Sequence, residues 1–333
     1  MSMYAQAATS KSKRRPSGFR LQLQCPGCKN LLGDLPHVEP HERFVVTCSL
    51  CDFELKTVNG IWKALLPKRA AYFERFMADY QAVRAAEGRG SECLDYYLSL
   101  PYQDSTGANQ AQWSIRAQTF RYLERKILPQ LEARHGSLAV LDLGAGNGWL
   151  SYRLAQRGHR PAAVDLMTDS RDGLGAAEHF GQVLLQLFPR IQAELDNVPI
   201  ANDQFDVAIF NASFHYSEDY QRTLTETIRC IKPGGVVIIA DTAWYSCEAS
   251  GVRMVAERQS AFLSRFGTAS DAIGSREFLT DQRLNALEDQ LGVRWQVHSP
   301  YYGLRWAARP LMAKLRGRRE PSKFRIYVAE VRK

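Results

Sequence analysis

The sequence predicts an α/β protein with a doubly wound parallel sheet, preceded by a small β segment that four cysteines organise. Three observations support this prediction. Four of the seven cysteines form two C-x-x-C pairs near the N-terminus. A continuous apolar strand, residues 138–143, runs directly into a glycine-rich loop and then a helical pattern. Strand-like and helix-like segments then alternate, which is the order of a parallel sheet with helices on both faces.

The composition is that of an ordinary soluble globular protein. Of the 333 residues, 45% are hydrophobic and 23% are charged, which excludes a wholly disordered or collagen-like chain. No apolar run approaches the ~18 residues that span a bilayer. The basic N-terminal residues are not followed by an apolar segment, so no secretory signal is predicted and we expect a cytoplasmic location.

The net charge of +8 is unevenly distributed along the chain. Residues 1–20 hold five Lys/Arg and no acid, and residues 305–333 hold ten Lys/Arg against two Glu, so the central part is mildly acidic. We expect residues 1–20 to be a disordered basic tail. The basic C-terminal stretch is compatible with RNA, with a protein partner or with peripheral contact to a membrane, but none of these follows from charge alone.

The spacing of the four paired cysteines is typical of a structural zinc site. Cys25 and Cys28 are separated from Cys48 and Cys51 by 19 residues, within the C-x₂-C-x₁₅₋₂₀-C-x₂-C pattern. Four thiolates complete a tetrahedral shell and leave no position for water, so the Zn²⁺ is predicted to be structural. The alternative is free or disulfide-bonded cysteines. His37 and His41 lie in the insert and could replace a ligand. The flanking strand patterns predict a zinc ribbon over residues 21–66.

Residues 67–135 are predicted to be a helical connector. From Pro67 the apolar pattern changes to a period of 3.6, and a second amphipathic helix contains Ile115, Thr119, Leu123 and Ile127 in register. Between these helices lie Tyr96, Tyr97 and Tyr102. These aromatic side chains belong either to the core or to a lid over a ligand pocket.

The glycine loop after the strand at residues 138–143 has its own spacing. Gly144, Gly146 and Gly148 form G-x-G-x-G, with Asp142 two residues before the first glycine. Glycines let the main chain approach a ligand where any Cβ would collide. A dinucleotide fingerprint requires glycine at the position that Trp149 occupies, and no G-x-x-x-x-G-K-[S/T] phosphate loop is present.

The strands that follow each end in a polar side chain. The second strand ends at Asp165, from which a carboxylate accepts hydrogen bonds from both ribose hydroxyls. Glu194 follows the third strand, and Asn211 follows the fourth strand at residues 205–210. A KPGG turn leads into the fifth strand, which ends at Asp241. In open α/β sheets, ligands bind at these carboxyl ends.

This ordered set of elements resembles the class I S-adenosylmethionine-dependent methyltransferases, in particular the small-molecule branch that includes the ubiquinone and menaquinone methyltransferases. The resemblance implies that residues 136–333 form a Rossmann-like domain with a seven-stranded sheet, whose last strand (324–331) is antiparallel, and with S-adenosylmethionine as the cofactor. The implied cofactor-site residues are Asp142, which orders the loop; Gly144, Gly146 and Gly148, which pack against the cofactor; Asp165, which holds the ribose; Glu194 and Leu195 at the adenine; and Asn211. Glu194 departs from the Asp that is commoner in the family.

Methyl transfer requires chiefly that a nucleophile be aimed at the methyl group. His215 is the candidate general base and Asp241 the candidate acid that orients the substrate, unless they serve only in packing or in a turn. The favoured function is methylation of a small molecule. One alternative is an RNA-base methyltransferase that docks RNA on the ribbon and the basic C-terminal stretch, an architecture that also resembles the ribosomal-RNA guanine-N1 methyltransferases. A non-enzymatic cofactor-binding scaffold is the third possibility.

Overall fold

The structure is a computed structural model that describes residues 20–38 and 42–333. The tail predicted at residues 1–20 lies outside the described residues except for Arg20, and so does His41. Within the described ranges, no helix is both long enough and apolar enough to cross a bilayer.

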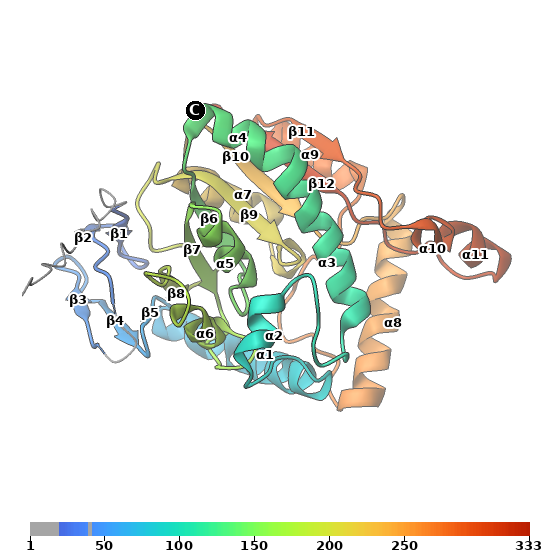
Figure 1. The fold of residues 1–333 in the computed structure, drawn as a ribbon, viewed down its shortest axis with the longest axis horizontal. Helices are drawn as coiled ribbons and strands as arrows, with labels where there is room; N and C mark the ends of the chain where they lie inside the picture. The colour runs from blue at the N-terminus through green and yellow to red at the C-terminus, as the bar shows by residue number, and fades with distance from the viewer. Residues whose placement is uncertain (1–19, 39–41) are drawn as a thin grey trace, which may run out of the picture.

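A twisted ten-stranded sheet forms the centre of the molecule, in the order β11-β12-β10-β9-β6-β7-β8-β5-β4-β3 (Figure 1). Its first seven strands are the predicted Rossmann-like sheet. Neighbours from β10 to β8 pair in parallel, whereas β12 is antiparallel to both β10 and β11, as expected for the last strand. The strands are β6 (Ala139–Leu143), β7 (Arg160–Asp165), β8 (Arg190–Gln192), β9 (Phe205–Asn211), β10 (Ile231–Ala240), β11 (Trp295–His298) and β12 (Ile326–Glu330).

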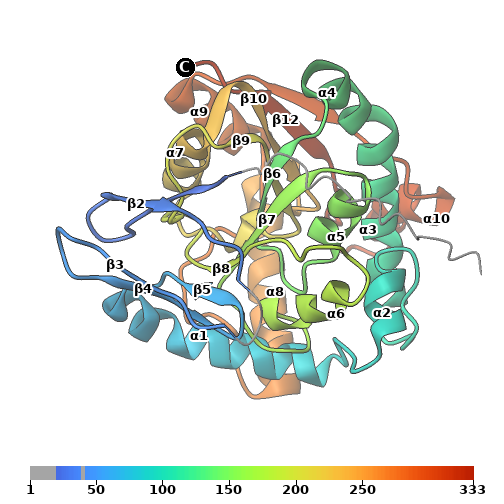
Figure 2. The ribbon, with the colours of Figure 1, turned by 60° about the vertical axis from the view of Figure 1, so that its left-hand side comes forward.

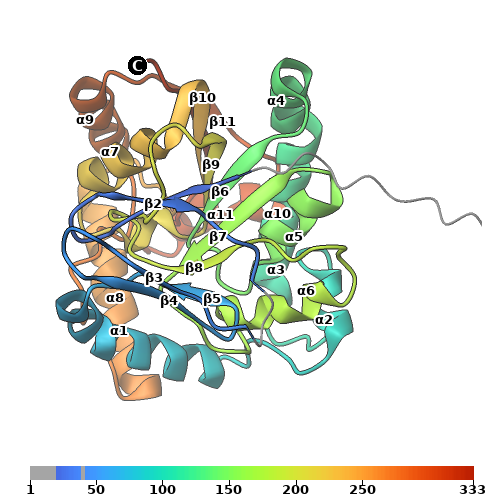
Figure 3. The same ribbon diagram turned by 90° about the vertical axis from the view of Figure 1, so that its left-hand side faces the viewer.

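The cysteine-containing segment extends this sheet. β3 (Val45–Thr47), β4 (Glu54–Val58) and β5 (Ile61–Lys63) pair antiparallel with one another, and β5 pairs in parallel with β8. Figure 3 shows these strands beside β8. A separate hairpin joins β1 (Gln22–Gln24) to β2 (Leu31–Asp34). Strands β1, β3, β4 and β5 were predicted, but β2 and the continuity of the ribbon with the larger sheet were not.

Helices cover both faces of the sheet, as a doubly wound fold requires. One apolar cluster contains Phe120 of α3 and Leu150 of α5, and the other contains Leu224 of α7 and Leu284 of α9. The helices before β9 are α1 (Pro67–Ala86), α2 (Leu94–Ser99), α3 (Gln110–Tyr122), the π-helical turn η1 (Leu123–Ile127), α4 (Leu128–His135), α5 (Trp149–Gln156), the 3₁₀ turn η2 (Leu174–Ala177) and α6 (Glu178–Gly181). Those after it are the 3₁₀ turn η3 (Phe214–Tyr216), α7 (Tyr220–Cys230), α8 (Glu248–Phe266), α9 (Asp281–Leu291), α10 (Leu304–Ala307) and α11 (Arg309–Leu315).

The connector is helical, and its first helix begins at the predicted proline. α1 has Pro67 in its first turn and buries Phe73, Phe76 and Val83. Figures 2 and 3 show α1 running past the ribbon strands, and it contacts α8. Tyr96 and Tyr97 are fully buried in the cluster that holds α3 and α5, so they belong to the core.

Candidate active site

A cavity of about 120 Å³ lies at the carboxyl ends of the central strands. The glycine loop after β6, the ends of β7 and β9 and the segment after β8 form its floor, while α1 and α3 contribute walls. The predicted site residues that line it are Gly144, Gly146, Asp165, Glu194, Leu195 and Asn211. Asp142, Gly148, His215 and Asp241 lie outside this lining.

The glycine loop makes two close approaches. A Cβ on Gly144 would lie 2.2 Å from the Cβ of Ser213, so only glycine lets this turn pack against the segment after β9. Gly148 has φ +79, and a Cβ there would lie 3.1 Å from Ala177 and Phe188. The structure therefore explains Gly148 by packing at the start of α5 and leaves Gly144 and Gly146 at the cavity.

Asp165 connects the second strand to the glycine loop. Its Oδ2 accepts a hydrogen bond from the backbone N–H of Gly146 and its Oδ1 accepts one from that of Met167, both at 2.7 Å. Burial raises the pKa of the carboxyl to about 6, against the lowering effect of these two donors. Each oxygen retains a lone pair, so the side chain fits a ligand that presents two hydroxyl donors.

Asp142 lies beneath the loop. Its carboxyl is buried and accepts a hydrogen bond from Ser151 Oγ of α5 at 2.8 Å. Burial raises its pKa to about 7. Its contacts therefore connect the end of β6 to the helix that follows the loop.

Glu194 lines the cavity and pairs with an arginine from far along the sequence. Arg69 Nε of α1 donates to Glu194 Oε2 at 2.7 Å. Burial raises the pKa of Glu194, and the ion pair with Arg69 opposes this effect. Arg69 also lies 3.6 Å from Glu218, which accepts a hydrogen bond from Tyr72. These contacts thus fix helix α1 across the carboxyl end of β8.

Asn211 lines the cavity, whereas the two predicted catalytic residues, His215 and Asp241, do not. Both polar atoms of the Asn211 amide are buried without a well-formed hydrogen bond among the described residues; the amide lies near enough to Asp241 to lower its pKa, and the side chain lines the cavity. Burial, assisted by Arg258, lowers the pKa of His215 to about 3, so its imidazole is neutral and a weak base at neutral pH. Asp241 Oδ1 accepts a hydrogen bond from Thr119 Oγ1 at 2.5 Å, and burial raises the pKa of Asp241 to about 6.

Several side chains at the cavity were not predicted from the sequence. The rings of Phe76 and Tyr80 on α1 lie 6.1 and 5.7 Å from the ring of Tyr216. Arg84 donates to Asp172 at 2.5 Å. Arg116 on α3 lies 4.8 Å from the Trp113 ring, and in the described part of the chain it forms no ion pair or hydrogen bond. Burial, with the nearby Arg89 and Arg84, lowers the pKa of Arg116 to about 10. The amphipathic pattern of the connector is the only sequence signal that pointed to this wall.

The four predicted metal ligands are close together. The Sγ atoms of Cys25, Cys28, Cys48 and Cys51 all lie within 4.8 Å of one another, and two of the separations are 3.5 and 3.4 Å. A tetrahedral zinc with Zn–S bonds of about 2.3 Å requires sulfur separations of roughly 3.8 Å. The cluster therefore fits a closed tetrathiolate site.

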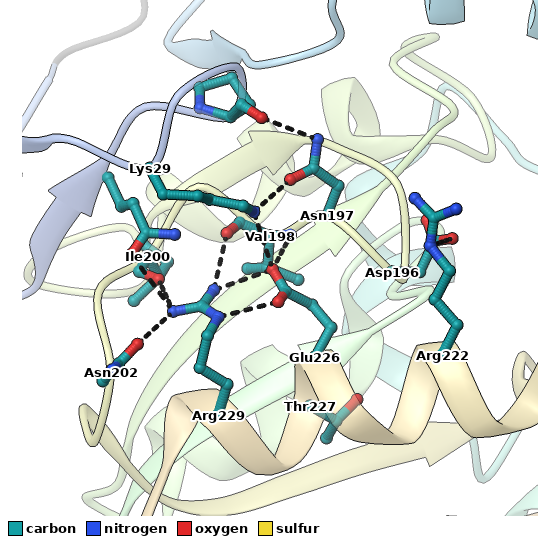
Figure 4. A network of polar contacts seen from close by, with 12 residues as sticks. Lys29, Asp196, Asn197, Val198, Ile200, Asn202, Arg222, Glu226, Thr227 and Arg229 are labelled. Carbon is teal, nitrogen blue, oxygen red and sulfur yellow. Dashed lines mark hydrogen bonds and ion pairs between the residues drawn. The ribbon is translucent and has the colours of Figure 1, made fainter.

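Side chains of the cysteine knuckle contact the segment that follows Glu194 (Figure 4). Lys29 Nζ donates to Asn197 Oδ1 at 2.5 Å and lies 3.5 Å from Glu226 of α7, while Asn197 Nδ2 donates to the backbone oxygen of Pro26 at 3.2 Å. Glu226 Oε1 accepts from the backbone N–H of Val198 at 2.8 Å. The loop that presents Glu194 and Leu195 is thus held between the knuckle and α7.

Comparison with known proteins gives one family match. Residues 141–239 match a family model described as a methyltransferase domain. This match covers the glycine loop, the ends of β7, β8 and β9, and most of β10, and these are the elements that form the floor of the cavity.

Curated relatives are similar to part of the chain. A malonyl-[acyl-carrier protein] O-methyltransferase of Pectobacterium atrosepticum is 26% identical over 163 residues, 49% of this chain and 54% of that protein. One from Buchnera aphidicola is 28% identical over 107 residues, 32% of this chain and 40% of that protein. The chain thus spans about half the length of the curated relatives it matches. An S-adenosylmethionine-dependent methyltransferase of Mesorhizobium loti has 20% identity and a TM-score of 0.43, over 61% of this chain and 96% of that one.

Proposed function

Since this chain carries a class I S-adenosylmethionine-dependent methyltransferase domain, we propose that it transfers a methyl group from that cofactor to a small-molecule acceptor. The observation that supports the proposal is that the ends of three successive strands of the sheet deliver Gly146, Asp165 and Glu194 to one cavity. A ligand with a diol, a base and a charged tail needs such donors and acceptors at separate points of one crevice.

The residues present fit the cofactor. Asp165, fixed by two backbone donors, would accept hydrogen bonds from the ribose hydroxyls. Glu194 and Leu195 would contact the adenine, with Arg69 holding the Glu194 carboxylate in place. Asn211 offers a buried amide without a well-formed hydrogen bond in the described chain, and a bound ligand would satisfy it.

The bound cofactor supplies an activated methyl group on a positively charged sulfur. The role of the chain is then to position the acceptor, exclude water and keep a favourable environment for positive charge. The rings of Phe76, Tyr80 and Tyr216 supply apolar surface and π faces at the cavity, which suit a cation that loses its charge as the reaction proceeds.

Arg116 indicates the charge of the acceptor. The carboxylates that line the cavity have partners: Arg84 for Asp172, Arg69 for Glu194 and Glu218, Arg222 for Asp196, and backbone donors for Asp165. Arg116 is a half-buried cation that lies near Asp241 and Asp172 but forms no ion pair with either in the described chain, so its charge is only partly compensated, and a charge withdrawn from water is costly unless paired. We therefore propose that it pairs with an anionic group of the acceptor.

An acceptor that is already an anion would not need a strong general base. His215 has a pKa of about 3 and does not line the cavity, so it is poorly suited to remove a proton at neutral pH. A carboxylate oxygen is a nucleophile without deprotonation, and the relatives reported above are named for O-methylation of a malonyl group. A small carboxylate-bearing metabolite or thioester is the acceptor class that we propose. The RNA alternative has no support beyond the basic C-terminal stretch.

The proposal is tested by incubating the protein with labelled S-adenosylmethionine and a cell extract, then fractionating the products. We expect label in anionic small molecules. Label in RNA would refute the acceptor class, and failure of the protein to bind the cofactor would refute the enzyme assignment.

A substitution of Arg116 tests the charge of the acceptor. Arg116→Gln should raise the acceptor KM by about 10- to 100-fold, because a hydrogen bond to a charged group contributes roughly 1.5–3 kcal/mol. The cofactor Kd should be unchanged, and Arg125→Gln, an exposed arginine of η1, is the control. A raised cofactor Kd with an unchanged acceptor KM would assign Arg116 to the cofactor and contradict the proposed acceptor charge.

A further inference from the structure

Outside the cavity, residues 299–319 form a projecting segment, which we call the arm. It contains α10 and α11, and neither helix buries a residue. Figure 1 shows the two helices at one end of the molecule, beyond α8. The arm holds six Arg/Lys and no Asp or Glu. Such a strongly basic, unburied segment needs an explanation other than stabilisation of the core.

The arm is attached to the body in a defined orientation. The Arg309 guanidinium lies 3.5 Å from the ring centroid of Trp306 and donates to the backbone oxygen of Ser322 at 2.7 Å. Trp306 stacks on Phe324 with centroids 5.4 Å apart, and the Tyr302 hydroxyl lies 2.9 Å from Thr119 Oγ1. These contacts fix one side of the arm against the body, so its opposite side is consistently presented to solvent.

The solvent side of the arm is apolar as well as basic. Leu304, Leu311 and Leu315 expose 80, 62 and 74% of their surface. Leu311 and Leu315 are four residues apart on α11, so they lie on one side of that helix, and Leu304 lies on the preceding helix α10. Exposed apolar side chains that gather in one place mark an interaction site more often than they serve stability.

A basic groove of about 710 Å³ runs between α8 and α11. Six arginines line it: Arg253, Arg305, Arg309, Arg316, Arg318 and Arg319. The one carboxylate of its described lining, Glu257, lies 2.5 Å from Arg319 and is therefore already paired. Arg253, Arg305, Arg316 and Arg318 have no acidic partner in the part of the chain that the structure describes. Guanidinium groups in this number suit phosphate oxygens.

We propose that the arm docks the protein on a bilayer that contains anionic phospholipid. The leucines enter the boundary between headgroups and acyl chains, and the groove arginines bind the lipid phosphates. The arm carries both features that such binding requires: exposed aliphatic side chains on α10 and α11, and unpaired cations that line the groove between α8 and α11.

Other occupants explain less of the arm. A second copy of the chain packed arm to arm would bring two strongly basic segments together, which Coulomb repulsion opposes. A single-stranded nucleic acid would use the arginines, but it stacks on aromatic rings and gains little from exposed leucines. An acidic protein would also use the arginines, and the experiment below separates it from a bilayer.

The test is cosedimentation of the full chain with phosphatidylcholine vesicles that contain about one third phosphatidylglycerol. We expect binding to these vesicles and weak binding to phosphatidylcholine alone. Arg316→Gln with Arg318→Gln should weaken binding about 25-fold, because each basic side chain at an anionic surface contributes roughly fivefold. Arg125→Gln with Lys126→Gln, an exposed basic pair on η1, is the matched control and should bind normally.

A second pair of variants tests the leucines. Leu311→Ser with Leu315→Ser should weaken vesicle binding at least about tenfold and remove the part that persists at high salt, where surface charges are screened. Val183→Ser with Leu185→Ser is the control at another exposed apolar site. The proposal would be overturned if the wild-type protein failed to bind anionic vesicles, or if the leucine variants bound them as tightly as the wild type. Tighter binding to polyglutamate than to vesicles would also overturn it.

Discussion

Substitution of Asp165 by Asn tests the cofactor site most directly. The ionised carboxylate accepts hydrogen bonds from Gly146 and Met167 and would accept two more from the ribose. A hydrogen bond to a charged group contributes about 1.5–3 kcal/mol and a neutral one about 0.5–1.5 kcal/mol. Converting two of the former to at most one of the latter should cost about 2–4 kcal/mol, which weakens cofactor binding by roughly 30- to 1,000-fold.

The pH dependence gives an independent check on the same residue. Burial raises the pKa of Asp165 to about 6, and the proposed hydrogen bonds from both ribose hydroxyls require the ionised carboxylate. Affinity should therefore fall as the pH drops below 6, by about tenfold for each further unit. The Asn variant should lack this dependence. Isothermal titration calorimetry between pH 5 and 8 measures both effects, with Asp289→Asn, a substitution of an exposed side chain on α9, as the control. An unchanged Kd, or a pH profile that survives the substitution, would refute the assignment.

Three further predictions follow from the geometry. Burial raises the pKa of Asp142 from 3.8 to about 7, so the neutral carboxyl favours the folded state. The free energy of unfolding should therefore decrease by about 4 kcal/mol as the pH rises from about 4 to 7. Asp142→Asn should abolish this pH dependence, as measured by urea unfolding. Gly144→Ala should destabilise the fold by about 1–3 kcal/mol more than Gly158→Ala, because Gly158 has a similar φ but its added Cβ would meet no neighbour within 4 Å. Equal losses of stability would show that Ser213 can move away from the added Cβ at little cost. Lys29→Gln should retain the metal but weaken cofactor binding about fivefold, because Lys29 contacts Asn197 in the loop after Glu194. Metal analysis and calorimetry measure the two effects. An unchanged cofactor affinity would show that the ribbon does not influence the site.

The sequence predicted well those parts of the site that depend on local order along the chain. An apolar strand followed by glycines, and further strands that end in Asp165 and Glu194, necessarily place these groups at one edge once the strands are parallel. The predicted seven-stranded sheet is confirmed because alternating strands and helices leave few topologies. The four cysteines were likewise identifiable, since their ligand spacing is set by tight local turns.

Residues just beyond the strand ends were less predictable. Asp241 has φ +54, and its side chain contacts Thr119 on α3, not the cavity. His215 lies in the 3₁₀ turn η3, after Ala212 at φ +55, and it is likewise outside the lining. A single left-handed residue changes the direction of the side chains after it, and Ala212 is not one of the residue types that favour this conformation and so signal the turn.

Long-range pairing was the other feature that sequence patterns could not supply. An amphipathic helix shows which side is buried, but Arg69 reaches Glu194 across 125 positions, and nothing local specifies that choice. The same holds for β5, which was predicted as part of a separate ribbon but pairs with β8. Strand partners are selected by the assembled core, and any unpaired edge with apolar neighbours is available for such pairing.

These long-range contacts bear on how the chain divides into working parts. The ribbon contributes β5 to the edge of β8 and Lys29 to the loop after Glu194, while the connector contributes Arg84 and Arg116 to the cavity and pairs Arg69 with Glu194. A chain that began at residue 136 would expose the edge of β8 and would lose one wall of the cofactor cavity. We therefore propose that residues 21–66, 67–135 and 136–333 operate as one unit, in which the metal-organised ribbon sets the position of the segment that meets the adenine.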